Sequence, residues 1–397
     1  MSESGAPVAV VLGLGQNGLA TVRALGRRGV PVIAVDANLE QPTARSRYCT
    51  ALRCPAFRTG GESLVQFLVE LGARLPERGV LFPSGDLNLL AVSEHRTTLA
   101  PFFHIGLPAR EIVRLILDKT AFYDFTARAG FPIPITRRLH PDNVREVAAS
   151  LTYPALLKPA LRDVGWRLKH DVKLYEIRSA EDLQLEYERL TPLGVDLLAQ
   201  ELIPGPDHEL RFSLTYVDAD GMPLAMFTGR KLRQYPPRFG TSSMAESLRD
   251  PAVAELSVAL LRALAYHGYA SVEFKRDPRD GALKIMEVTG RTWYPHGLAT
   301  HCGVNLPYLA YCHQTGLPLP RVEPWADGVK WIDEDRDVRS ALAERRAGRL
   351  GLAAWLRSYR GPRTYALSAL DDLGPMIALT RRTARAALRR VSLRAAS

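Results

Sequence analysis

The 397-residue sequence contains few cysteines, few lysines and no long apolar run. Its four cysteines do not have the spacing of a disulfide framework, which excludes the small disulfide-stapled class and predicts a reducing, cytoplasmic location. No apolar stretch approaches the roughly 20 residues that a membrane-spanning helix needs. The first residues, MSESGAPVAVVLGLG, do not have a basic segment followed by an apolar one, so we expect no export signal.

The charge balance is strongly positive, with a formal net charge of +10. Arginine supplies most of the positive charge, because only eight of the 52 basic residues are lysine. Such an excess suits ligands that carry phosphate. At 397 residues and 46% hydrophobic content, the chain is expected to form about two to four globular domains.

The first 110 residues alternate between short apolar runs and amphipathic segments, a pattern typical of a doubly wound parallel sheet. The predicted strands are residues 8–12, 30–35 and 79–82, and the predicted helices are residues 18–28, 64–75 and 87–97. This part is therefore expected to be a Rossmann-like α/β domain. Two further helices are predicted after it, at residues 108–117 and 120–129.

From about residue 135 strands predominate, which indicates an α+β fold rather than a second Rossmann unit. The predicted strands are 155–158, 173–177, 197–201, 211–217 and 224–233, and the predicted helices are 180–190 and 251–266. A less regular region after residue 320 ends in a basic segment, 379–394. We expect four regions, with boundaries at 1–112, 113–195, 196–322 and 323–397.

Residues 271–291 are predicted to form a β-hairpin with one glutamate on each strand. A three-residue loop with Gly281 in a left-handed conformation would place Glu273 directly opposite Glu287. A four-residue loop would place the two glutamates on opposite faces. Two carboxylates on one face repel unless a cation lies between them, and oxygen ligands suit Mg²⁺. The hairpin alone leaves open a pair of solvated surface glutamates.

A glycine-rich turn follows the first predicted strand. Gly13, Gly15 and Gly18 form a GxGxxG pattern that opens a helix, and Asp36 ends the second strand. In dinucleotide enzymes such a turn receives a pyrophosphate and the acid binds ribose, which would make the protein a nicotinamide-dependent oxidoreductase. The same turn can also cradle a substrate carboxylate or have only a structural role.

Cationic side chains lie at the ends of several predicted elements. Lys119 follows Asp118 at a helix start, Lys158 ends an apolar strand, and Lys231 alternates with Arg233 along another strand. An ammonium group at the end of a buried strand is costly to desolvate unless it meets an anion. These positions favour contact with phosphate, and the alternative for each is a solvent-reaching surface lysine.

A further candidate is the end of the strand at 197–201, where Gln200 and Glu201 precede Leu202, Ile203 and a Pro-Gly turn. The two apolar side chains can sandwich an adenine ring while backbone groups contact its edge. Glu209 can accept hydrogen bonds from ribose hydroxyls. A solvated turn is the alternative.

In order and spacing these features resemble the ATP-grasp superfamily over roughly residues 8–320, and within it the carboxylate–amine ligase-like, D-aspartate ligase-related group. The resemblance implies a Rossmann-like pre-ATP-grasp domain followed by two α+β lobes that grip ATP. It implies ATP and Mg²⁺ (or Mn²⁺) as cofactors. The implied enzyme activates a carboxylate as an acyl phosphate and passes it to an amine or a thiol.

The resemblance also assigns roles to single residues. By this resemblance Lys119 and Lys158 contact the phosphates, and the adenine contacts are Gln200, Glu201, Leu202 and Ile203, with Glu209 on the ribose. The implied metal ligands are Glu273, Glu287 and Thr289, and the residues that stabilise the transferred phosphoryl group are Lys231, Arg233 and Arg291. Substrate binding is assigned to Gly13, Gly15 and Gly18. Thr289 stands where the family usually has asparagine. The phosphate-covering loop is expected near residues 161–170, where only Gly165 is glycine.

The expected partners are small-molecule carboxylate and amine substrates, without nucleic acid. The basic tail has helical spacing and can either contact an anionic membrane surface or form a solvated terminal helix. A homodimer and a non-catalytic nucleotide-binding role also remain open. The tail arginines are Arg381, Arg382, Arg385, Arg389, Arg390 and Arg394.

Overall fold

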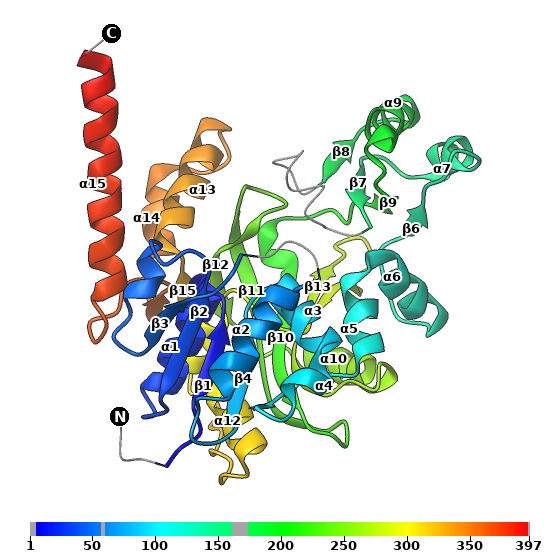
Figure 1. Ribbon diagram of the computed structural model, residues 1–397. Coiled ribbons are helices and arrows are strands. Elements are labelled where there is room, and N and C mark those ends of the chain that lie inside the picture. Colours follow the sequence, from blue (N-terminus) through cyan, green and yellow to red (C-terminus); the bar gives the residue numbers. More distant parts are fainter. Residues whose placement is uncertain (1–4, 57–59, 161–173, 396–397) are drawn as a thin grey trace. The chain divides into compact units, whose positions relative to one another are not determined.

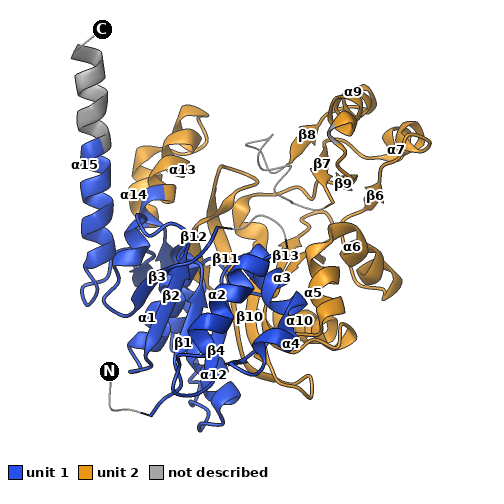
Figure 2. Ribbon diagram, in the orientation of Figure 1, with its two compact units in different colours: residues 1–106, 291–335, 359–397 blue, residues 107–290, 336–358 orange. Residues whose placement is uncertain are grey.

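The computed structural model describes residues 5–56, 60–160 and 174–395 (Figure 1). The chain forms two compact units, shown in different colours in Figure 2. Unit 1 consists of residues 1–106, 291–335 and 359–397, and unit 2 of residues 107–290 and 336–358. None of the described helices has the length and apolar content that crossing a bilayer requires.

A five-stranded parallel sheet forms the centre of unit 1, in the order β3-β2-β1-β4-β5. Its strands are β1 (Ala9–Leu12), β2 (Val32–Asp36), β3 (Thr50–Arg53), β4 (Gly79–Pro83) and β5 (Phe103–His104). Every residue of β1 is 0% exposed, as expected for a parallel sheet covered on both faces. The strand order reverses between β1 and β4, the position at which such sheets commonly bind ligands.

The helices predicted at 18–28 and 64–75 form as α1 and α2, whereas strands β3 and β5 and the 3-10 helix η1 were not predicted. The single helix predicted at 87–97 is two helices, because the chain turns at His95, where φ is −107° and ψ is 25°. The helical elements are α1 (Gln16–Gly26), the 3-10 helix η1 (Pro42–Arg45), α2 (Glu62–Gly72), α3 (Asp86–Glu94) and α4 (Arg96–Leu99).

The C-terminal part of the chain returns to unit 1 and is held there by a buried ion pair. Arg23 on α1 donates through Nε to Asp372 over 2.8 Å, and the two side chains are 5% and 0% exposed. The elements of this part are α11 (Gly297–His301), α12 (Leu306–Thr315), β15 (Lys330–Ile332), β16 (Arg363–Tyr365) and α15 (Gly374–Ala395). The long helix α15, red in Figure 1, begins against η1.

The region after residue 320 contains more regular structure than the sequence indicated. Helix α13 (Glu334–Arg346) forms from a strongly charged sequence, and the short helix α14 (Leu352–Ser358) follows it. Among its residues α13 buries only Asp337, Ser340 and Ala341, so there is no apolar stripe to detect.

Unit 2 contains a small antiparallel sheet in the order β6-β9-β7-β8. Helices α7 and α9 pack beside it around a core that includes Leu157, Leu183 and Leu197 (Figure 1). The elements are β6 (Thr136–Arg138), α7 (Val144–Ser150), β7 (Ala155–Pro159), β8 (Tyr175–Ile177), α9 (Ala180–Leu190), η2 (Thr191–Leu193) and β9 (Leu197–Glu201).

The larger sheet of unit 2 has antiparallel strands in the order β14-β13-β10-β11-β12. One face packs on a core that contains Val272, Phe274, Ile285 and Val288. The elements are α5 (Arg110–Leu117), α6 (Lys119–Arg128), η3 (Asp207–Glu209), β10 (Leu210–Val217), β11 (Pro223–Tyr235), β12 (Thr241–Ser247), α10 (Pro251–Ala263), β13 (Gly268–Arg276) and β14 (Leu283–Thr289). The sequence did not predict β12.

Candidate functional site

The hairpin of β13 and β14 has a four-residue loop, not the three-residue loop that the metal hypothesis required. The amide of Asp277 donates to the carbonyl of Ala282 over 2.8 Å, which closes residues 278–281 into the loop. Gly281 has φ of 74°, as expected. With regular pairing this loop would place the two glutamates on opposite faces of the sheet.

A β-bulge at Met286 restores the alignment. Phe274 pairs with Ile285, but the next pair is Glu273 with Glu287, so Met286 is an extra residue on β14. Ile285 is 0% exposed on the core face, and the bulge reverses the alternation that follows it. Glu287 therefore leaves the core face and lies opposite Glu273.

The polar face of this hairpin carries the proposed metal ligands. Glu287 is exposed, and Thr289, two positions further along β14, is 9% exposed and pairs with Ser271. The Glu273 carboxylate forms an ion pair with Lys231 over 2.6 Å. Lys231 is 4% exposed, so its charge balances Glu273 in a largely dry environment.

Lys158 is buried at the centre of a second group of polar side chains in unit 2. Its Nζ donates to Gln200 Oε1 over 2.7 Å and to the hydroxyl of Tyr123 over 3.2 Å. Burial lowers the pKa of Lys158 well below its usual value, Lys119 lowers it further, and the charge of Glu287 opposes the shift. The structure thus brings Lys119, Lys158, Gln200 and Glu287 within electrostatic reach of one another.

The position of Lys119 follows from helix capping. Asp118 accepts hydrogen bonds from the amides of Thr120 and Ala121 and so begins α6 directly at Lys119. The Lys119 amide donates to the carbonyl of Ala160, just beyond the end of β7. The two predicted lysines therefore lie on neighbouring segments.

The residues predicted to contact a nucleoside occupy the end of β9 and the start of β10. Glu201 is 8% exposed; it accepts from the amide of Ile135 and pairs with Arg279. Glu209 Oε2 is buried without a hydrogen-bond donor among the described residues, although Arg211 Nη2 lies 3.6 Å away. An acceptor of this kind suits a hydroxyl donor from a ligand.

Two predicted phosphoryl contacts are engaged elsewhere. Arg233 donates to both carboxylate oxygens of Asp337 over 2.8 Å, and Asp337 is 0% exposed. Arg291 pairs with Asp86 at the start of α3, within unit 1. Lys231 and Arg233 thus have different anionic partners, and a bulge between them separates their pairing positions.

The glycine-rich turn is occupied by polar groups of unit 1 itself. Asp36 Oδ2 accepts from the amide of Leu14 over 2.7 Å, so the acid that a dinucleotide would use is bonded to the turn. A Cβ on Gly18 would lie 2.0 Å from the carbonyl oxygen of Gly13, so helix and turn approach closely here. A pocket of about 190 Å³ lies beside Gly13, Asp36 and Asn88.

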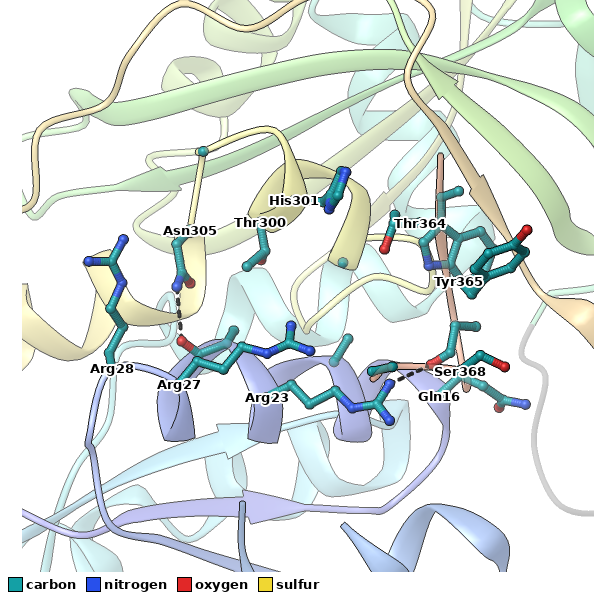
Figure 3. Close-up of a pocket in the computed structure, with 17 residues that line it drawn as sticks. Gln16, Arg23, Arg27, Arg28, Thr300, His301, Asn305, Thr364, Tyr365 and Ser368 are labelled. Carbon is teal, nitrogen blue, oxygen red and sulfur yellow. Dashed lines mark hydrogen bonds between the residues drawn. The ribbon is translucent and has the colours of Figure 1, made fainter. Parts of the chain in front are cut away.

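A separate pocket of about 340 Å³ lies within unit 1 (Figure 3). Arg23, Arg27 and His301 line it, together with Tyr365, and it includes none of the predicted site residues. Asp372 and Asp371 already neutralise Arg23 and Arg27. We assign it no ligand.

Comparison with known proteins finds similarity both in sequence and in structure. The chain is 23% identical over 255 residues to a D-aspartate ligase of Enterococcus faecium, a match covering 62% of this chain and 61% of that protein. It superposes on a biotin carboxylase–ATP complex from Campylobacter jejuni with a TM-score of 0.61 and 17% identity, over 79% of this chain and 72% of the other. The chain has the ATP-grasp fold.

A second superposition supports this conclusion. The ADP complex of an N5-carboxyaminoimidazole ribonucleotide synthetase gives a TM-score of 0.62 at 15% identity, covering 82% of each chain. No family model matches the sequence. The ATP-grasp fold predicted from the sequence is confirmed, although the chain spans only about three-fifths of the D-aspartate ligase that it resembles.

Sequence reasoning missed some of the residues that organise the candidate site. Tyr123 is 3% exposed and bonded to Lys158, and Arg279 pairs with Glu201 from the hairpin loop. Tyr123 lies four positions after Lys119, one helical turn further on, which was the available signal. No sequence signal pointed to Asp337, since its partner Arg233 is more than a hundred positions away. The expected phosphate-covering loop at 161–170 lies outside the described residues.

Proposed function

We propose that this protein is an ATP- and Mg²⁺-dependent ligase that converts a carboxylate and ATP to an acyl phosphate and ADP, and then transfers the acyl group to an amine with release of phosphate. The observation that carries the proposal is the alignment of Glu273 and Glu287 on one face of the sheet. The charge of Glu287 also acts on the pKa of the buried Lys158, so the carboxylate and the lysine lie close enough to interact. The ATP-grasp fold and the similarity to a D-aspartate ligase support the same reaction class.

The proposed nucleotide contacts suit the groups that the structure presents. Lys158 is a buried amine held by neutral partners and its pKa is lowered, so a phosphate would supply the negative charge that favours its ammonium form. Lys119 would add a second charge beside it. Glu209 has a buried acceptor for a ribose hydroxyl, and the segment from Glu201 to Ile203 would contact adenine.

The proposed metal site has two carboxylates. Among the residues that the structure describes, no three or more histidine, cysteine, aspartate or glutamate side chains converge on one point. Mg²⁺ commonly binds through one or two carboxylates and completes its shell with phosphate oxygens and water. Glu273, Glu287 and Thr289 fit that donor set. A bound Mg²⁺ would neutralise phosphate charge during transfer.

The side chains of the protein would then balance the charge of the phosphates and orient the metal ligands. Lys231 steadies Glu273 through their 2.6 Å ion pair, and it would offset charge on the transferring phosphoryl group. Arg233 and Arg291 would assist only if they release Asp337 and Asp86. The substrate carboxylate would be the nucleophile, so no protein nucleophile is required.

The turn formed by Gly13, Gly15 and Gly18 is the proposed position for a substrate. Asp36 lines the adjoining pocket and disfavours a simple anion there, whereas an amino acid offers both an ammonium group and a carboxylate. Asp36 is bonded to the turn amide of Leu14, which argues against its use for a nicotinamide cofactor.

The test is ADP release measured over paired carboxylates and amines, with amino acids as both partners and mass spectrometry of the products. Glu287→Gln should abolish ATP-dependent product formation without unfolding the protein, because Glu287 is exposed and loses only its charge. Glu255→Gln, on an exposed face of α10, is the matched control. Full turnover in Glu287→Gln would remove the metal assignment, and ADP binding without turnover for every pair would indicate a non-catalytic nucleotide binder.

The expected domain boundaries, the cytoplasmic location, a homodimer and a contact between the basic tail and a membrane stay predictions. Helix α15 carries exposed Arg381, Arg382 and Arg385. Size measurement in solution and binding to anionic vesicles would test the last two.

A further inference from the structure

Tyr123 links the two halves of the candidate site through a single hydroxyl group. The hydroxyl donates to the carbonyl oxygen of Met286 over 2.6 Å and accepts from Lys158 Nζ over 3.2 Å. The Lys158 ammonium also lies over the Tyr123 ring, 4.6 Å from its centroid. One phenol therefore contacts both the buried lysine and the bulged strand.

The bulge that Tyr123 contacts is the feature that aligns the glutamates. Met286 is the extra residue that moves Glu287 onto the face of Glu273. Bulges leave a local gap in the strand-to-strand hydrogen bonding, so an outside donor at that position stabilises the bulged conformation. The Met286 carbonyl has such a donor in Tyr123.

The surroundings of the phenol keep it a donor. Tyr123 is 3% exposed, and burial raises its pKa; a hydrogen bond with Gln200 lowers the pKa in part, and the charges of Glu287 and Glu273 add smaller increases. A phenol that stays protonated keeps its hydrogen on the Met286 carbonyl and its lone pair toward the Lys158 ammonium. The two hydrogen bonds are thus compatible with each other.

We propose that Tyr123 is a positioning residue that holds the Met286 bulge, and with it the facing glutamates, in register with the Lys158 ammonium. The proposal rests on the proposed function, since it explains how a nucleotide lysine and a metal-binding pair are kept in one geometry. Tyr123 itself needs no contact with the nucleotide or the metal.

The test is Tyr123→Phe, which removes the hydroxyl and keeps the ring. The matched control is Tyr266→Phe, because the Tyr266 hydroxyl is equally buried in unit 2 and donates to the carbonyl of Tyr269 over 2.7 Å. Mn²⁺ binding is titrated at saturating ADP by electron paramagnetic resonance. Loss of a group that orients metal ligands commonly weakens metal affinity about 10–100-fold, so we expect the Mn²⁺ Kd to rise about ten-fold in Tyr123→Phe and to stay within about two-fold in Tyr266→Phe.

Hydrogen exchange supplies a readout that needs no ligand. Tyr123→Phe should speed amide exchange in residues 283–289, whereas Tyr266→Phe should not affect exchange in these residues. Equal Mn²⁺ affinities in the two variants, or unchanged exchange at 283–289, would overturn the positioning role. A wild-type protein that fails to bind Mn²⁺ with ADP would instead remove the proposed function on which this role depends.

Discussion

The ion pair of Lys231 and Glu273 offers a quantitative test of the candidate metal site. Lys231→Met keeps the length of the side chain and removes its charge. At 2.6 Å and an effective dielectric constant of about 20, the pair attracts by about 6 kcal/mol before desolvation is subtracted. Removing one partner of a buried pair commonly costs about 3–5 kcal/mol, because the other charge is left without compensation.

For Lys231 and Glu273 we expect a cost slightly below the range of about 3–5 kcal/mol. The Lys231 and Glu273 side chains are 5% and 19% exposed, so water can partly solvate the remaining carboxylate. We expect a loss of about 2–4 kcal/mol in the free energy of unfolding of unit 2. For a unit of roughly 200 residues this corresponds to a Tm lower by about 5–15 °C.

The assay is thermal unfolding in EDTA and again with millimolar Mg²⁺ and ADP. A metal ion at Glu273 replaces the lost charge, so the Tm gap between variant and wild type should narrow with Mg²⁺ and ADP. Lys284→Met is the control, since its partner Asp280 is 54% exposed at 3.8 Å and such pairs contribute about 0–1 kcal/mol. A variant as stable as wild type in EDTA would refute the argument about the ion pair, and an unchanged gap with Mg²⁺ and ADP would refute metal binding at Glu273.

Two further predictions concern charged groups in the core of unit 2. The lowered pKa of Lys158 means that, at pH values between this pKa and about 10.4, the unfolded chain binds a proton that the folded chain has lost. The free energy of unfolding should therefore rise with pH over this window. Urea unfolding at pH 7 and pH 9 measures this dependence, and Lys158→Met should make it weaker. An unchanged pH dependence in the variant would show that Lys158 is not its source. Arg233→Met should lower the free energy of unfolding by about 3–5 kcal/mol without any ligand, because it leaves Asp337 charged and 0% exposed. A variant with native stability and impaired turnover would instead favour a direct catalytic role for Arg233.

Much of the fold could be predicted because hydrophobic periodicity is a local property. The apolar run at 8–12, the alternation on both sides of residue 280 and the helix at 180–190 each reflect burial that neighbouring residues share. Helix α13 was missed for the same reason, since its few buried residues include Asp337 and Ser340 and give no apolar pattern.

The geometry of the candidate site depends on contacts that local sequence patterns do not reveal. From the sequence, Glu273 and Glu287 would face each other only with a three-residue loop, and a four-residue loop would separate them. The alignment depends on the bulge at Met286, which lies between Ile285 and Val288, two residues that pack on the core. A one-residue register shift is invisible in a pattern of period two unless both ends of the strand are known to be buried.

The sequence by itself determined the strand–helix alternation of the first domain, the glycine-rich turn, the positions of the scarce lysines and the two glutamates of the hairpin. The tertiary structure decided which of these residues meet. In it Lys158 donates hydrogen bonds to Gln200 and Tyr123. Lys231 forms an ion pair with Glu273, and Arg233 forms one with Asp337. Partners of a buried charge are selected by desolvation and three-dimensional proximity, and neither quantity is encoded in the spacing of residues along the chain.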